Sequence, residues 1–246
     1  MGKIVAIGGG EISLHETWHI DQFIVQFSGV LHPRVLFIPT ASNDSEGYIA
    51  TMKKVYGEQL GCEVDTLVLV KGKMHESEIK QKILSAHIIY VGGGDTVKML
   101  EVWRDDNVDF YLKQAYEQNI VLSGLSAGSI CWFQKGHSEG KSEHNPDGWW
   151  DNQQPIGLGL IPAIHCPHYN ERGHEQFDKM LNQETIPGVG IENNCAIVIK
   201  DNLYKVVKTD SDSKAYLLHN RNGMFNKTEL TASEFVPIKD LFQRVD

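Results

Sequence analysis

The stretch VLSGLSAGSI, residues 121–130, joins an apolar strand-like run to a segment that can open a helix. Gly124, Ser126 and Gly128 within it form a G-x-S-x-G pattern. In this pattern the serine occupies a sharp strand-to-helix turn, and the two glycines let the flanking backbones pass without a Cβ clash. The following helix then directs its N-terminal amides and positive dipole end toward the serine. The stretch therefore predicts a βα unit whose Ser126 is either a nucleophile or a helix cap.

Similar units surround this one. Strands are predicted at 3–9, 34–40, 63–70, 87–95 and 120–126, and helices at 15–28, about 46–60, from an N-cap at Ser77, 96–103 and 107–118. Near-continuous apolar strands that alternate with helices indicate a mostly parallel sheet with helices on both faces. From residue 186 onward, strand, Asp201-Asn202 turn and strand predict an antiparallel hairpin. We expect one α/β domain spanning residues 1–246, with a long loop at 135–155 that is either a functional lid or disordered.

Composition excludes several classes of function. The formal charge is −9, and no basic stripe offers a surface for nucleic acid or for an acidic membrane. The N-terminus lacks a signal-peptide pattern, and no apolar run is long enough to span a membrane. Four cysteines lie far apart without a CxxC pair, which argues against a metal site and favours a reduced, cytoplasmic protein.

Two glycine triplets end predicted strands. Gly93 and Gly94, in the triplet 92–94, permit close approach of backbone amides to a ligand oxygen, which suits an oxyanion hole shared with the Ala127 amide. A tight turn capped by Asp95 or Thr96 is the alternative. The triplet 8–10 lacks the third glycine and the acidic residue of a dinucleotide-binding fingerprint, so we expect no nucleotide cofactor.

A nucleophilic serine needs a base and a group that orients the base. His165 and His168 follow a strand-like run, where active-site residues of α/β sheets collect. Glu192 stands at the end of a predicted strand, whereas Glu139 and Asp147 lie in the long loop. These carboxylates are the candidates for holding the imidazole tautomer.

In this order, GGGD, GLSAGS, PHY and GIEN resemble the dipeptidase E (aspartyl dipeptidase) and cyanophycinase family of serine peptidases. The resemblance runs from the first strand through the hairpin. It implies a three-layer α/β fold related to class I glutamine amidotransferases, with no cofactor. It also implies Ser126 as nucleophile, His168 as base, and the amides of Gly94 and Ala127 as oxyanion hole. The implied substrate is a short peptide, including dipeptides with an acidic N-terminal residue.

The sequence departs from the family pattern at the acid. Glu192 stands at the first position after GI and Asn193 at the second, where dipeptidase E has its acid. A one-residue shift on a strand turns a side chain to the other face, so either residue can orient His168. Some family members carry an acid at the position of Glu139. Our expectation is Glu192.

Substrate contacts are predicted at three further places. Arg172 resembles the arginine that binds an acidic substrate side chain in dipeptidase E, although its spacing is shorter; the alternative is a solvated helix-start arginine. Ser42 follows the second strand and either bonds substrate or caps the next helix. Trp149 and Trp150 either shape a substrate mouth or pack the loop.

Two other functions share the G-x-S-x-G pattern. An α/β-hydrolase esterase would use His219 as its base, because its acid precedes a late histidine. A non-enzymatic small-ligand binder would retain the turn without chemistry. The predicted serine peptidase acts as a monomer or a homodimer, since nothing in the sequence demands an oligomer.

Overall fold

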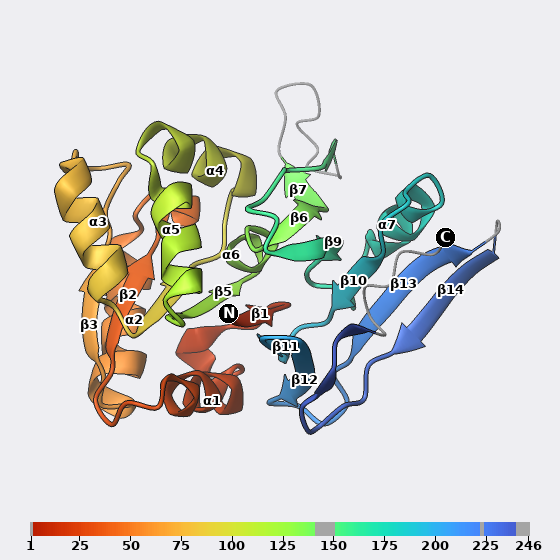
Figure 1. Cartoon of the computed structure of the whole chain (residues 1–246), viewed down its shortest axis with the longest axis horizontal. Helices are drawn as coiled ribbons and strands as arrows, with labels where there is room; N and C mark the ends of the chain where they lie inside the picture. Colours follow the sequence, from red (N-terminus) through yellow and green to blue (C-terminus); the bar gives the residue numbers. More distant parts are fainter. Residues whose placement is uncertain (1, 141–150, 222–223, 240–246) are drawn as a thin grey trace.

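The computed structural model describes residues 2–140, 151–221 and 224–239, which form a mixed α/β fold with two main sheets (Figure 1). Two short 3-10 turns lie at Ile12–Leu14 and Thr40–Ser42, and a π-helical segment, Lys53–Gln59, continues α2. The α-helices are α1 (Trp18–Ser28), α2 (Glu46–Met52), α3 (Glu76–Ser85), α4 (Thr96–Asp105), α5 (Val108–Glu117), α6 (Ala127–Ile130) and α7 (His174–Leu181).

The first sheet has eight strands in the order β15-β12-β11-β1-β5-β4-β2-β3. Its five N-terminal strands are parallel, as predicted, and the three added strands are antiparallel. The parallel strands are β1 (Lys3–Ile7), β2 (Arg34–Ile38), β3 (Glu63–Thr66), β4 (Ile88–Val91) and β5 (Val121–Leu125). The antiparallel strands are β11 (Cys195–Lys200), β12 (Leu203–Lys208) and β15 (Val236–Pro237).

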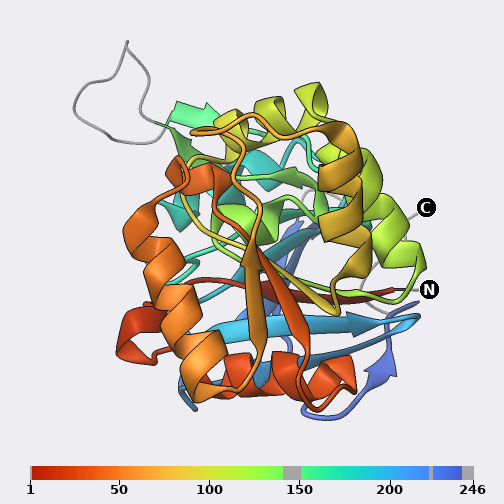
Figure 2. The ribbon, with the colours of Figure 1, turned by 90° about the vertical axis from the view of Figure 1, so that its left-hand side faces the viewer.

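Helices cover both faces of the first sheet. Alternate residues of β1 point to opposite faces, so Ile4 and Ala6 join the core beneath α3, α4 and α5, whereas Val5 and Ile7 join the core beneath α1 and α2. Figure 2 shows α1 on one side of the strands and α3 and α5 on the other. This arrangement agrees with the near-continuous apolar strands, because strands buried on both faces cannot alternate with polar residues.

A second sheet, of five strands in the order β14-β13-β10-β9-β6, was not predicted. The helix expected after Ser126 ends at Ile130, and the chain at once enters the first of these strands. Helix α7 packs on this sheet through Phe177 and Leu181. The strands are β6 (Phe133–Gly136), β9 (Ile161–Cys166), β10 (Gly188–Ile191), β13 (Ala215–Arg221) and β14 (Met224–Glu229), and a separate two-stranded sheet contains β7 (Ser138–Gly140) and β8 (Asp151–Gln153).

The predicted C-terminal hairpin is confirmed, but its first strand begins only at Cys195. Strands β11 and β12 pair around the Asp201 turn, whose φ is 56°. The preceding strand β10, however, belongs to the second sheet, so the chain crosses from one sheet to the other within residues 192–194. Asn193 makes an isolated bridge to Gly9 there, and Asn194 has a φ of 62°.

Smaller differences concern caps and the long loop. Helix α3 begins at Glu76 after His75, so Ser77 lies in its first turn rather than at its N-cap. Part of the expected loop forms β7 and β8 instead. Asp147, Trp149 and Trp150 lie outside the described residues.

Within the described ranges, no helix combines the length and the apolarity needed to cross a membrane. All four cysteines are buried and none forms a disulfide.

Candidate active site

Ser126 lies on a strained turn between β5 and α6, with φ 56° and ψ −118°. A positive φ is costly for a residue with a side chain and occurs mostly where the surroundings enforce it. The flanking glycines confirm the predicted reason for the pattern. A Cβ on Gly124 would collide with the carbonyl oxygen of Gly128, and a Cβ on Gly128 would collide with that of Val91. The backbone therefore holds the Ser126 hydroxyl at the carboxyl edge of the first sheet.

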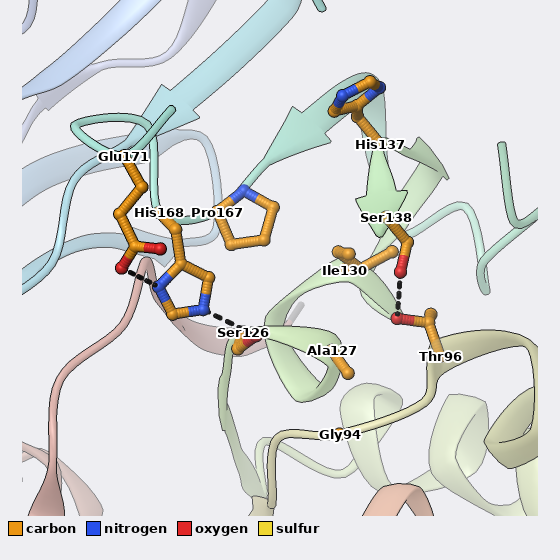
Figure 3. A pocket seen from close by; sticks show the side chains of 10 residues that line it. All are labelled: Gly94, Thr96, Ser126, Ala127, Ile130, His137, Ser138, Pro167, His168 and Glu171. Atoms are coloured by element: carbon orange, nitrogen blue, oxygen red, sulfur yellow. Dashed lines mark hydrogen bonds and ion pairs between the residues drawn. The ribbon is translucent and has the colours of Figure 1, made fainter. Parts of the chain in front are cut away.

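His168 completes a serine–histidine pair. Its Nε2 lies 2.8 Å from Ser126 Oγ, and its own φ is 49°. Figure 3 shows the ring between Ser126 and Glu171. The ring comes from the turn between β9 and α7, so Ser126 and His168 follow strands of different sheets. At 2.8 Å a neutral imidazole can accept the hydroxyl proton.

The end of β1 aligns both residues. The Ser126 amide donates to the Ile7 carbonyl and the His168 amide donates to the Gly8 carbonyl, each at 3.1 Å. The next carbonyl, that of Gly9, accepts from the Asn194 amide at 2.9 Å. Three consecutive carbonyls therefore fix Ser126, His168 and the crossing segment relative to one another. In the sequence, the glycine triplet 8–10 marks this part of the site. The triplet was predicted not to bind a nucleotide, and no other role was predicted for it.

Asn193, rather than Glu192, contacts the far side of the histidine ring. Asn193 Oδ1 lies 2.7 Å from His168 Nδ1. Asn193 Nδ2 in turn donates to Glu171 Oε1 at 2.7 Å, and that carboxylate oxygen is 3.3 Å from His168 Nδ1. A chain of four polar side chains thus runs from Ser126 to Glu171.

The expectation that Glu192 orients His168 does not fit this geometry. Its carboxylate accepts from the Lys214 amide at 2.8 Å and from the Tyr216 hydroxyl at 3.3 Å, both on the side of β13. The physical reason is the alternation of an extended chain, which turns neighbouring side chains to opposite faces. The described part of Glu139 is its backbone in β7, and its side chain lies outside what the structure describes.

A cavity of about 210 Å³ opens on one side of the Ser126–His168 pair. Gly94 and Ala127 line it, as expected of residues whose amides face the reacting group, and Glu171 lines it too (Figure 3). Gly94 has a φ of 138°, and a Cβ there would collide with the Ala41 carbonyl. Buried His137 is a further lining residue, and burial lowers its pKa to about 4, which keeps it neutral near pH 7.

A second cavity, of about 370 Å³, opens on the other side of the same pair. Gly93 and Glu11 line it together with Tyr48. The Gly93 amide donates to the Tyr48 hydroxyl, and burial raises the pKa of that hydroxyl, so it stays protonated. Ser126 and His168 therefore line both cavities.

Two predicted substrate contacts lie elsewhere. Arg172 is exposed and is not among the described residues that line either cavity. Ser42 donates to the Pro39 carbonyl at 2.9 Å, and the N-cap of α2 is Ser45, so Ser42 does not cap that helix. The cavities instead bring together Thr96 and Ser138, whose hydroxyls are 3.2 Å apart.

The other candidate histidines do not reach Ser126. His165 is fully buried between Ser129 Oγ and the Val189 carbonyl, at 2.8 and 2.9 Å, and burial lowers its pKa to about 3. It forms a second serine–histidine pair, but a substrate cannot enter it. His219 lies on β13, opposite Asn226 of β14.

Comparison with known proteins relates this chain to peptidases. The model of peptidase family S51 matches residues 4–207. An uncharacterized peptidase of Bacillus subtilis, YgaJ, is 31% identical over 88% of this chain and 91% of its own. A probable alpha-aspartyl dipeptidase of Drosophila melanogaster is 22% identical over 84% of this chain and 81% of its own.

Solved structures share the fold. A peptidase from an acI-B1 Actinobacterium superposes with a TM-score of 0.72 at 22% identity, over 96% of this chain and 97% of the other. A putative peptidase E protein from Listeria monocytogenes EGD-e gives a TM-score of 0.66 at 21% identity, over 85% of this chain and all of the other.

Proposed function

This chain belongs to peptidase family S51 and is a serine-type peptidase, and we propose that it cleaves short peptides by acyl transfer through Ser126. One observation carries the assignment of the nucleophile: the 2.8 Å separation between Ser126 Oγ and His168 Nε2, at a strained turn between two cavities. A serine that only caps a helix requires neither a strained backbone nor a hydrogen bond to a histidine.

In the first step Ser126 Oγ attacks the carbonyl carbon of the peptide bond, and its proton passes to His168 Nε2. The resulting imidazolium donates that proton to the amine of the leaving fragment as the C–N bond breaks. Water then attacks the acyl-enzyme ester, His168 accepts a proton from the water, and returning it to Ser126 releases the acid product. Asn193 Oδ1 accepts from Nδ1–H throughout, which keeps Nε2 free to accept.

The amides of Ala127 and Gly94 stabilise the tetrahedral oxyanion in this mechanism. Ala127 directly follows the nucleophile, and Gly94 lines the same cavity. Preorganised amides of this kind are each worth about 3 kcal/mol of transition-state stabilisation. Gly93, which lines the second cavity, contributes its backbone to substrate binding.

The geometry favours this reading over an α/β-hydrolase esterase. That alternative needs His219 beside the nucleophile, whereas His168 holds the position next to Ser126. The Drosophila relative is named an alpha-aspartyl dipeptidase, which supports a peptide substrate of minimal length. The predicted role of Arg172 as ligand of an acidic N-terminal residue gains no support from the cavities, because Arg172 is exposed and is not among the described residues that line them.

We also propose the finer features that the family resemblance implies. The layering is that of class I glutamine amidotransferases, which the helices on both faces of the first sheet support. Residues 1–246 form one domain, and the protein works in the cytoplasm as a monomer or homodimer. The net charge of −9 supports a function without nucleic acid or membrane.

The test is labelling with a fluorophosphonate probe together with hydrolysis of a dipeptide and blocked-peptide library. Wild type should be labelled at Ser126, as located by peptide mass spectrometry, and should release amino acids from short peptides. Ser126→Ala should lose both properties. Ser123→Ala is the matched control, because Ser123 is a buried serine of β5 whose hydroxyl donates to the Ile89 carbonyl.

His168→Ala should lose at least about 10³-fold in kcat/KM, since no other described histidine reaches the nucleophile. A wild-type enzyme that neither reacts with the probe nor cleaves any peptide would overturn the proposed function. Activity that survives in His168→Ala and disappears in His219→Ala would restore the esterase reading.

A further inference from the structure

We infer that Glu171 is the acid of this active site, a positioning residue that supplies the negative charge which Asn193 lacks. The inference rests on the proposed function, because it assigns a role to His168 in proton transfer. Nothing in the sequence marks Glu171, which lies in the turn between β9 and α7. The structure assigns it through contacts with both members of the histidine–asparagine pair.

The first step of the argument is the direction of each hydrogen bond. If His168 Nε2 accepts from Ser126, its Nδ1 carries the proton and must donate. An asparagine side chain offers one acceptor and one donor group, so it can hold the ring only when Oδ1 faces Nδ1. The carboxylate of Glu171 can only accept, and it takes the Nδ2–H of Asn193 at 2.7 Å. Glu171 therefore forces the amide into the orientation that selects the correct histidine tautomer.

The second step is charge. Proton transfer from Ser126 turns His168 into an imidazolium, and a neutral amide stabilises that cation far less than a carboxylate does. Glu171 Oε1 lies 3.3 Å from His168 Nδ1, close enough to act on the ring directly. Its side chain is half exposed, so water screens this attraction in the free enzyme. A substrate in the cavity that Glu171 lines would exclude part of that water and strengthen the effect.

The third step is the rigidity of the turn. The Glu171 amide donates to the His168 carbonyl at 2.8 Å, and Asn170 Oδ1 accepts from the Asn193 amide at 3.0 Å. The turn and the crossing segment are thus bound to each other beside the ring. Glu171 therefore belongs to a turn that hydrogen bonds hold beside the ring, and its backbone position relative to His168 is fixed.

Other titratable groups near the ring are few. Glu11 lines the second cavity, His137 lines the first, and His165 lies behind the ring. Burial lowers the pKa of His137 to about 4 and that of His165 to about 3, so both side chains are neutral near pH 7. Glu11 Oε1 accepts from both the amide and the hydroxyl of Ser13.

The experiment compares wild type, Glu171→Gln, Glu171→Asp and the matched control Glu175→Gln. Glu175 lies four residues further along the same segment and bonds the Gly173 amide instead. Glutamine keeps an oxygen for Asn193 but loses the charge, so Glu171→Gln isolates the electrostatic role. It should lower kcat/KM about 10-fold to 100-fold, mainly through kcat, and Glu171→Asp should recover part of the loss.

Two further readouts separate this role from a structural one. The low-pH limb of kcat/KM should move to lower pH in Glu171→Gln, because this variant lacks a unit negative charge 3.3 Å from the ring. In ¹⁵N NMR spectra, neutral His168 should be the Nδ1–H tautomer in wild type and a mixture in Glu171→Gln. The Glu175→Gln variant should match wild type in both.

A pH profile and a tautomer population in Glu171→Gln equal to those of Glu175→Gln would overturn the inference. The NMR readout needs no turnover. An enzyme that fails the labelling and peptide tests would therefore refute the proposed function while the role of Glu171 was still measured.

Discussion

Replacing Gly9 with alanine places one methyl group against the polar chain of the active site. Built on the backbone of Gly9, that Cβ lies 2.5 Å from His168 Cε1 and closer still to His168 Nδ1 and Asn193 Oδ1. An ordinary carbon contact begins near 3.4 Å, so the ring must retreat by about 0.9 Å. The methyl also stands beside the hydrogen bond between Asn193 and the ring, which must lengthen or break.

A displacement of this size has a predictable effect on catalysis. Misplacing a catalytic group by about 1 Å costs about 10²-fold in rate, which is ~2.7 kcal/mol of transition-state stabilisation. We therefore expect kcat/KM of Gly9→Ala on its best peptide to fall about 100-fold, and fluorophosphonate labelling to slow in proportion. The free energy of unfolding should fall by only about 1 kcal/mol, because the methyl meets half-exposed side chains that can yield.

Two alanine variants serve as comparisons. Gly8→Ala directs its methyl at the backbone carbonyls of Ile191 and Glu192, which cannot yield, so it should lose more than about 3 kcal/mol of stability. Gly47→Ala, in α2, meets only Ser45 Oγ at 3.9 Å and should retain activity. Kinetics on the peptide library and urea unfolding separate the two effects. If Gly9→Ala kept wild-type kcat/KM with an unchanged fold, the alignment of His168 by the end of β1 would be refuted.

Two further predictions concern charge. Burial raises the pKa of Asp21 to about 7, although the hydrogen bonds from Thr17 and Tyr56 oppose this shift, so the folded state holds the proton more tightly than the unfolded state. The free energy of unfolding should therefore fall by roughly 3 kcal/mol between pH 4 and pH 7 relative to Asp21→Asn. The prediction is contradicted if urea unfolding gives the same change in the free energy of unfolding between pH 4 and pH 7 for both proteins. Among the described residues that line the two cavities, Glu11 and Glu171 carry carboxylates and no lysine or arginine is present. Because these carboxylates repel an acidic substrate side chain, dipeptides with a basic or neutral N-terminal residue should exceed Asp-X dipeptides at least ~10-fold in kcat/KM. A preference for Asp-X on the same panel would instead establish Arg172 as the carboxylate ligand.

Local patterns were sufficient for much of the first sheet. The strands and helices up to residue 126 were predictable because apolar periodicity and capping residues act within one element, as Asp95 does when it accepts from the Lys98 amide. The turn at Ser126 was predictable for the same reason, since its two glycines solve a steric problem confined to five residues.

The partner of His168 is a different kind of question. Whether Glu192 or Asn193 faces the ring depends on where the chain leaves β10 and enters β11, and that crossing depends on two sheets packing together. Glu171 meets Asn193 across 22 residues of chain, and no spacing rule connects a turn to a crossing segment. The sequence by itself predicted Ser126 as the candidate nucleophile and determined the parallel sheet that presents it. Only the tertiary structure decided which side chains contact His168 Nδ1, because hydrogen bonds between distant segments form only after both segments have been placed.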